Sequence, residues 1–191
     1  MILIGIGANL PSPRYGEPLA TCGAALSALA EARLSIATRS RWYKSAPVPA
    51  SNQPWFINGV IHVKTALGPG ALMALLLETE EAFGRNRAEP KEARVLDLDL
   101  LAYGDIVTEE NGAAGEYGLR LPHPRLHERA FVLLPLLDTA PDWRHPVSGQ
   151  SVRDMIEALP PGQKTEAIPD AGGDFGTEGR ESNAIEGEGP G

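Results

Sequence analysis

The fold is indicated most clearly by residues 95–103, which read VLDLDLLAY. Successive side chains of a β-strand point to opposite faces of the sheet, so this run would put Asp97 and Asp99 on one face and the intervening leucines on the other. Its nearly continuous apolar character predicts a central strand. We therefore expect a strand that presents two neighbouring carboxylates on a single face.

Both strands and helices are predicted before this run. Three segments have strand character and two have the apolar stripe of a helix: strands at 1–8, 34–42 and 55–65, and helices at 17–33 and 69–84. The resulting order, β-α-β-β-α-β, is that of a ferredoxin-like α+β fold, in which two helices cover one face of an antiparallel sheet and leave the other free for ligands. Further helical stretches are predicted near 129–137 and 152–159.

Length and composition exclude several classes of protein. The 191 residues suit one domain, and 25 Asp and Glu against 17 Lys and Arg oppose nucleic-acid binding through phosphates. The single cysteine, Cys22, predicts a reducing compartment, the cytoplasm. The apolar N-terminal run ends at Asn9 and is too short for a membrane span. We expect a cytoplasmic protein that binds neither nucleic acid nor a membrane.

The C-terminal part has a different composition. Residues 171–191 contain seven of the 21 glycines and five acidic residues, with only Phe175 and Ile185 as sizeable apolar side chains. Such a segment buries too little apolar surface to offset the entropy of ordering. The prediction is one domain over residues 1–160, followed by a disordered Gly- and Glu-rich tail over 161–191.

The two aspartates predict a metal site. Carboxylates on one face repel each other unless a cation lies between them. Asp97 and Asp99 supply oxygen ligands of the kind that Mg²⁺ uses together with water and substrate phosphates. An edge strand with a solvated acidic face would have the same pattern, so the pair alone leaves both interpretations open.

Basic residues gather around the acidic pair. Seven of the 17 lie within 45 positions: Arg85, Arg87, Lys91, Arg94, Arg120, Arg125 and Arg129. A guanidinium offers a planar fork to phosphate oxygens, so the group predicts a site for a phosphorylated substrate, with surface salt bridges as the alternative. The sequence has neither a P-loop nor a complete GxGxxG pattern, so a nucleotide would be held by metal and arginines.

Two histidines follow these arginines. His123 and His127 are four residues apart, a zinc spacing within a helix, but Pro124 opposes a helix through His123 and no cysteine is nearby. We favour His123 as a hydrogen-bond donor to phosphate.

A second pattern predicts a site for a flat ring. Phe56 and Asn58 are two positions apart in a predicted strand and would share a face. A heterocycle could lie on Phe56, meet Asn58 with its polar edge, and be covered by Phe131. Ordinary core packing of the two rings is the alternative.

Together these motifs resemble the 6-hydroxymethyl-7,8-dihydropterin pyrophosphokinases of folate biosynthesis over residues 2–159. The resemblance rests on these stretches: GANL at 7–10, QPWFIN at 53–58, EEAFGRNR at 80–87, RVLDLD at 94–99, LPHPR at 121–125 and RAFV at 129–132. It implies a ferredoxin-like fold and an enzyme that moves the β,γ-diphosphoryl group of ATP to the hydroxymethyl oxygen of the pterin and releases AMP.

The resemblance also implies a role for each matching residue. Asp97 and Asp99 correspond to the pair that holds two Mg²⁺ ions, and Arg85 and Arg94 to the arginines of a mobile catalytic loop. The remaining implied contacts divide between the substrates: ATP by Glu80, Arg87, Leu100, His123 and Arg129, and the pterin by Ser45, Val48, Phe56, Asn58 and Phe131.

We expect a monomeric enzyme. Two other interpretations stay open. One is a different metal-dependent transferase that uses the DxD pair on another nucleotide donor, and the other is a non-enzymatic ferredoxin-like module that binds a small ligand.

Overall fold

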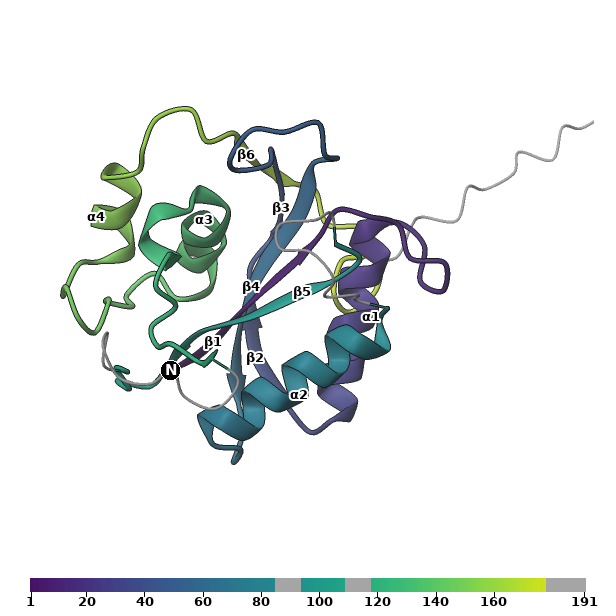
Figure 1. Cartoon of the computed structure of the whole chain (residues 1–191), viewed down its shortest axis with the longest axis horizontal. Helices are drawn as coiled ribbons and strands as arrows, with labels where there is room; N and C mark the ends of the chain where they lie inside the picture. Colours follow the sequence, from purple (N-terminus) through teal and green to yellow (C-terminus); the bar gives the residue numbers. More distant parts are fainter. Residues whose placement is uncertain (85–93, 109–117, 178–191) are drawn as a thin grey trace, which may run out of the picture.

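The structure is a computed structural model that describes residues 1–84, 94–108 and 118–177 (Figure 1). Its elements follow the order β1 (Ile2–Ala8), α1 (Pro18–Glu31), β2 (Ser35–Arg39), β3 (Trp42–Ser45), β4 (Phe56–Lys64), α2 (Pro69–Ala82), β5 (Asp97–Tyr103), the 3₁₀-helix η2 (Leu126–Glu128), α3 (Ala130–Thr139), α4 (Val152–Glu157) and β6 (Thr165–Ile168). None of the helices in these ranges has the length and apolar character that crossing a membrane requires.

All pairings in the sheet are antiparallel. The strand order is β5-β1-β4-β3-β6, and β2 also pairs with β4. Because β2 and β3 share the position beside β4, this is the predicted ferredoxin-like α+β arrangement with one strand divided in two.

The segment predicted as one strand over 34–42 is therefore two strands. At the break, the Ser40 hydroxyl accepts the Val60 N–H at 3.0 Å and donates to the Arg41 carbonyl at 2.6 Å. The Arg41 guanidinium turns to Asp138, with 2.9 Å between Nη2 and Oδ1. The alternating pattern continues across the break, so hydrophobic periodicity could not reveal it.

Helices lie on both sides of the sheet (Figure 1), and an apolar core lies on each face. Helices α1 and α2 cover one face, where Leu26 and Leu76 are fully buried. Helices α3 and α4 cover part of the second face, where Leu133 belongs to the same cluster as Leu3. The second face was expected to be free for ligands, and this is only partly right, because the sheet is open around Gly7 but closed around Leu3.

The chain beyond residue 160 is part of the fold, so the predicted domain boundary and the predicted disorder are wrong for residues 161–177. Strand β6 pairs with β3. Two further contacts hold the segment to the sheet: Trp42 Nε1 donates to the Phe175 carbonyl at 2.8 Å, and Arg39 Nη2 lies 2.6 Å from Asp170 Oδ2. These partners are more than 130 positions apart in the chain, which composition cannot indicate. The tail prediction for 178–191 lies outside the described residues.

Candidate active site

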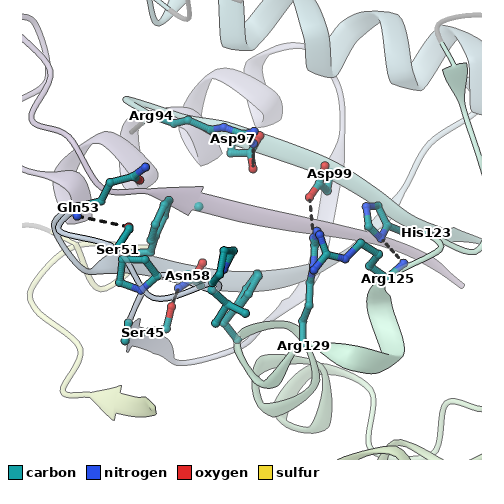
Figure 2. Close-up of a pocket in the computed structure, with 17 residues that line it drawn as sticks. Ser45, Ser51, Gln53, Asn58, Arg94, Asp97, Asp99, His123, Arg125 and Arg129 are labelled. Carbon is teal, nitrogen blue, oxygen red and sulfur yellow. Dashed lines mark hydrogen bonds and ion pairs between the residues drawn. The ribbon is translucent and has the colours of Figure 1, made fainter. Parts of the chain in front are cut away.

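A cavity of about 570 Å³ opens on the part of the sheet that α3 and α4 leave uncovered (Figure 2). Gly7 of β1 forms its floor, with Asp97 of β5 as its neighbour on one side and Asn58 of β4 on the other. A Cβ at Gly7 would lie 3.3 Å from Asn58 Oδ1, closer than such contacts usually are. Because Gly7 has no side chain, the floor of the cavity stays open between Asp97 and Asn58.

The acidic pair lies on one side of this cavity. Asp97 and Asp99 both point into it from β5, as the period of two predicted (Figure 2). Arg94 Nη1 lies 2.5 Å from Asp97 Oδ2, and Arg129 Nη1 lies 3.9 Å from Asp99 Oδ2. Each carboxylate thus has a guanidinium within 4 Å, and the two carboxylates lie on the same face of β5.

The site disfavours the ionised form of Asp99. Loss of hydration within the site, followed by repulsion from Asp97, raises the pKa of Asp99 from its usual 3.8 to about 7, although Arg129 opposes the shift. The cations of the described residues therefore compensate the ionisation of Asp99 near neutral pH only in part. Two neighbouring carboxylates whose charge is only partly balanced are suited to a divalent cation. Asp97 and Asp99 supply the oxygen ligands that Mg²⁺ takes from proteins.

Strand β5 lies at the edge of the described sheet, which corrects the prediction of a central strand. The buried Glu80 carboxylate of α2 accepts the Leu98 N–H at 2.7 Å, so α2 takes the place of a neighbouring strand at that point. The Leu100 side chain lies in the core with α1 and α2 and does not line the cavity. The structure therefore puts the side chains of Glu80 and Leu100 beside and behind β5, away from the acidic pair's open face.

His123 is held in one protonation state. Its Nδ1 accepts the Arg125 backbone N–H at 3.1 Å, and the backbone N–H of His123 donates to the Leu101 carbonyl at 2.8 Å. Burial, followed by the nearby charge of Arg129, lowers the pKa of the imidazole from 6.5 to about 4. At neutral pH the ring is therefore uncharged, with Nδ1 as acceptor and the proton on Nε2.

Arg129 connects the charged and aromatic parts of the cavity. It is the N-cap residue of α3, and its guanidinium carbon lies 5.5 Å from the centre of the Phe131 ring. Burial lowers the pKa of the Arg129 guanidinium from its usual value, but arginine keeps its charge at any physiological pH. Both residues line the cavity, so a cation and a flat apolar surface are presented together.

The predicted ring-binding residues meet at the other side of the same cavity. Phe56, Phe131, Asn58, Ser45 and Val48 all line it. Asn58 is buried, and its Nδ2 donates to Ser45 Oγ at 2.8 Å (Figure 2), which fixes the direction of the amide. The sequence patterns that predicted an acidic site and an aromatic site therefore describe two halves of one cavity.

Asn9 is a connecting residue, for which the sequence predicted no role beyond its place in the GANL stretch at 7–10. It is 1% exposed, and its Oδ1 accepts the Arg94 N–H at 2.6 Å. Its Nδ2 contacts Gln53 Oε1 at 3.3 Å and the Pro54 carbonyl at 3.2 Å. One side chain thus joins the end of β1 to the segment before β4 and to the segment before β5. A polar residue directly after a buried strand was the available signal.

Two of the predicted catalytic and ATP-binding residues, Arg85 and Arg87, lie outside the described residues. Within the described ranges, no group of three or more His, Cys, Asp or Glu side chains could hold a metal ion. The ring of His127 lies 6.0 Å from that of His145, between ring centres, in an edge-on arrangement. A cation at Asp97 and Asp99 would have to complete its coordination with water and ligand oxygens.

Comparison with known proteins agrees with this geometry. The family model for 7,8-dihydro-6-hydroxymethylpterin-pyrophosphokinase matches residues 3–141. Two similar proteins carry the name 2-amino-4-hydroxy-6-hydroxymethyldihydropteridine pyrophosphokinase. The one from Synechocystis sp. is 37% identical over 158 residues, with 82% of this chain and 75% of the relative covered. The one from Methylorubrum extorquens is 34% identical over 159 residues, with 83% of this chain and 92% of the relative covered.

Solved structures show the same fold. The crystal structure of wild-type Plasmodium falciparum HPPK-DHPS with pteroate superimposes with a TM-score of 0.60 at 14% identity. The match covers 82% of this chain and 44% of that one, so the chain spans less than half of that longer protein. At this identity the likeness establishes the fold alone.

Proposed function

We propose, because the chain belongs to the 7,8-dihydro-6-hydroxymethylpterin-pyrophosphokinase family, that it transfers diphosphate from ATP to 6-hydroxymethyl-7,8-dihydropterin and releases AMP, a step of folate biosynthesis. One observation carries the proposal. The paired carboxylates and their arginines share a single cavity with two phenylalanines and an oriented amide. A triphosphate suits the first half, and the flat pterin suits the second.

The phosphate half would hold two Mg²⁺ ions on Asp97 and Asp99. When bound, the ions neutralise charge on the triphosphate oxygens and so favour the charge redistribution of phosphoryl transfer. Arg129 is directed at the same region and would bind a phosphate oxygen. His123 would donate from Nε2, because its Nδ1 is already used as an acceptor. The uncharged ring can do this without adding repulsion toward Arg129.

The rest of the nucleotide would lie toward the edge of β5. We assign Arg85, Arg87 and Arg94 to one loop that contacts the phosphates, with Arg85 and Arg94 as catalytic residues. Glu80 and Leu100 belong to the nucleotide site, and since the Leu100 side chain is buried, its contribution would come from the backbone.

The aromatic half would bind the pterin between Phe56 and Phe131. Asn58 would hydrogen-bond the polar edge of the ring, since its Nδ2 contact to Ser45 holds the amide in one orientation. Val48 is 44% exposed and lines the mouth of this half, where its side chain and neighbouring backbone would complete the pocket.

Catalysis by this arrangement would depend mainly on positioning. The chain would hold the hydroxymethyl oxygen of the pterin near the β-phosphorus of ATP, while Arg94 and Arg129 stabilise charge on the transferred group. Two bonds change: the pterin oxygen bonds to the β-phosphorus, and the bond from that phosphorus to the oxygen bridging to the α-phosphate breaks. AMP leaves, and the hydroxyl proton is lost to solvent.

We also propose that the enzyme is monomeric, because one copy of the described chain already supplies both the acidic and the aromatic residues of the cavity. The single cysteine, Cys22, is fully buried and takes no part in the site, which supports an enzyme of the reducing cytoplasm.

The test is a timed chromatographic assay with ATP, Mg²⁺ and 6-hydroxymethyl-7,8-dihydropterin. We expect AMP and pterin diphosphate in equal amounts, only when metal and pterin are both present, and a large loss in Asp97→Asn with the fold retained by circular dichroism. Metal-dependent use of another nucleotide donor without AMP would instead identify a different transferase. Binding of ATP and pterin without turnover would identify a ligand-binding module.

A further inference from the structure

We propose that Gln163 is a positioning residue for the active site, acting on Arg129 and Phe131 from the C-terminal segment. The proposal rests on the proposed function, since it explains how two residues of that site are held. Gln163 lies between α4 and β6, beyond the domain boundary that the sequence predicted.

Gln163 contacts the backbone on both sides of Arg129. Its Oε1 accepts the Ala130 N–H at 2.9 Å, and its Nε2 donates to the Glu128 carbonyl at 2.8 Å. The two ends of one planar amide therefore fix the residues before and after Arg129. The direction in which the Arg129 side chain leaves the backbone depends on the peptide groups held in this way.

This clamp, in which the Gln163 amide bonds Glu128 and Ala130, also gives a partner to an N–H group at the start of α3. The first N–H groups of a helix have no partner within the helix and are usually bonded by the side chain of the N-cap residue. Arg129 is the N-cap residue of α3 and makes no side-chain cap, because a guanidinium has only donors. Gln163 supplies an acceptor to Ala130, the first of these N–H groups, and the Arg129 guanidinium is directed toward Asp99.

The same segment contacts the pterin side of the site. The Ala46 N–H donates to the Lys164 carbonyl at 3.0 Å, next to the residues that lead to Val48. The ring of Phe131 stands two positions after Arg129 and one after Ala130, so the clamp sets its position as well. Residues 163 and 164 thus connect the start of α3 with the segment after β3.

The test compares Gln163→Ala with a matched variant, Glu166→Ala, which truncates an exposed side chain of the same segment outside the cavity. Each would be measured for kcat and KM with both substrates, for calorimetric binding of Mg²⁺-ATP without pterin, and for the unfolding midpoint. Assays would be run well below the lower midpoint, so that all variants are folded.

We expect Gln163→Ala to lower kcat/KM by about tenfold, less than the ~100-fold that a misplacement of about 1 Å can cause. We also expect it to weaken Mg²⁺-ATP binding severalfold, while Glu166→Ala behaves as wild type. In an Arg129→Ala background, the same change should lower kcat/KM by only about threefold, because the effect through Arg129 is lost and only the effect through Phe131 remains.

Two outcomes would overturn the proposal: Gln163→Ala with wild-type kinetics and binding, or equal losses with and without Arg129. A wild-type protein that forms no pterin diphosphate would be a separate result, since it would overturn the proposed function. In that case the Mg²⁺-ATP binding comparison would still report on the clamp.

Discussion

The Arg129 guanidinium faces the Asp99 carboxylate across the candidate active site, with 3.9 Å between Nη1 and Oδ2. The distance is too long for a close ion pair, and the pKa of Asp99 is still raised to about 7 by loss of hydration and by Asp97. Among the residues that the structure describes, Arg94 and Arg129 therefore supply only part of the positive charge that Asp99 requires beside Asp97. A metal-bound triphosphate would supply the rest.

Replacement of Asp99 should separate activity from stability. Asp99→Asn removes a proposed metal ligand, so we expect activity to fall by about 100-fold or more. Because the folded state raises the pKa of this carboxyl above the unfolded value of 3.8, the folded state binds more protons than the unfolded state up to about pH 7. Stability of the wild type without metal therefore decreases as the pH rises through this range.

The Asp99→Asn protein lacks this penalty and should unfold at a higher temperature than wild type near pH 8 without Mg²⁺, with a difference that shrinks toward pH 4. Asp105→Asn, an exposed carboxyl just after β5, is the matched control and should change neither property. A lower unfolding midpoint for Asp99→Asn near pH 8 would contradict the proposed electrostatics.

The pH dependence of turnover should report Asp99. At limiting Mg²⁺, protonation of Asp99 opposes metal binding, so kcat/KM should fall as the pH drops below about 7. Higher Mg²⁺ competes with protons and should move the midpoint to lower pH. His123 cannot account for this midpoint, because its pKa is about 4. The measurement is a pH profile at two Mg²⁺ concentrations, and a midpoint that does not respond to Mg²⁺ would exclude this origin.

Loss of the Asn9 side chain should weaken both stability and turnover. Asn9→Ala leaves the Arg94 N–H without its acceptor and the Pro54 carbonyl without its donor. We expect the free energy of unfolding to fall by about 2 kcal/mol, the usual range for buried groups left unpaired, and kcat/KM to fall for both substrates. Urea unfolding would measure the first effect. Asn52→Ala, at an exposed position of the same segment, is the control and should unfold at the same urea concentration as wild type. A wild-type unfolding curve for Asn9→Ala would be inconsistent with the observed contacts.

The C-terminal segment should be required for stability. A chain ending at residue 160 loses β6 and the contacts of Asp170 and Phe175 with the sheet, whereas a chain ending at 177 keeps them. We expect the shorter chain to unfold about 10 °C lower, since a loss of ~1 kcal/mol shifts the midpoint of a chain of this size by about 2–4 °C. Equal midpoints in differential scanning calorimetry would restore the boundary that composition suggested.

Local patterns predicted much of the fold and the site. The period of two correctly put Asp97 and Asp99 on one face, because side-chain direction in a strand depends only on position. Contacts between distant segments could not be predicted in this way. The break at Ser40 and the pairing of β6 both depend on partners elsewhere in the chain. The same holds for Asn9 and Gln163, whose amide side chains acquire their roles only from the loops that they join.

The central claim is that an intact diphosphoryl group moves from ATP to the pterin. Phosphorus NMR of a reaction with ATP, Mg²⁺ and 6-hydroxymethyl-7,8-dihydropterin tests it directly. We predict that the AMP resonance and a pair of mutually coupled resonances from pterin diphosphate grow together as the ATP signals decline. Formation of ADP with a single phosphorus on the pterin, or hydrolysis of ATP with the pterin unchanged, would contradict the account.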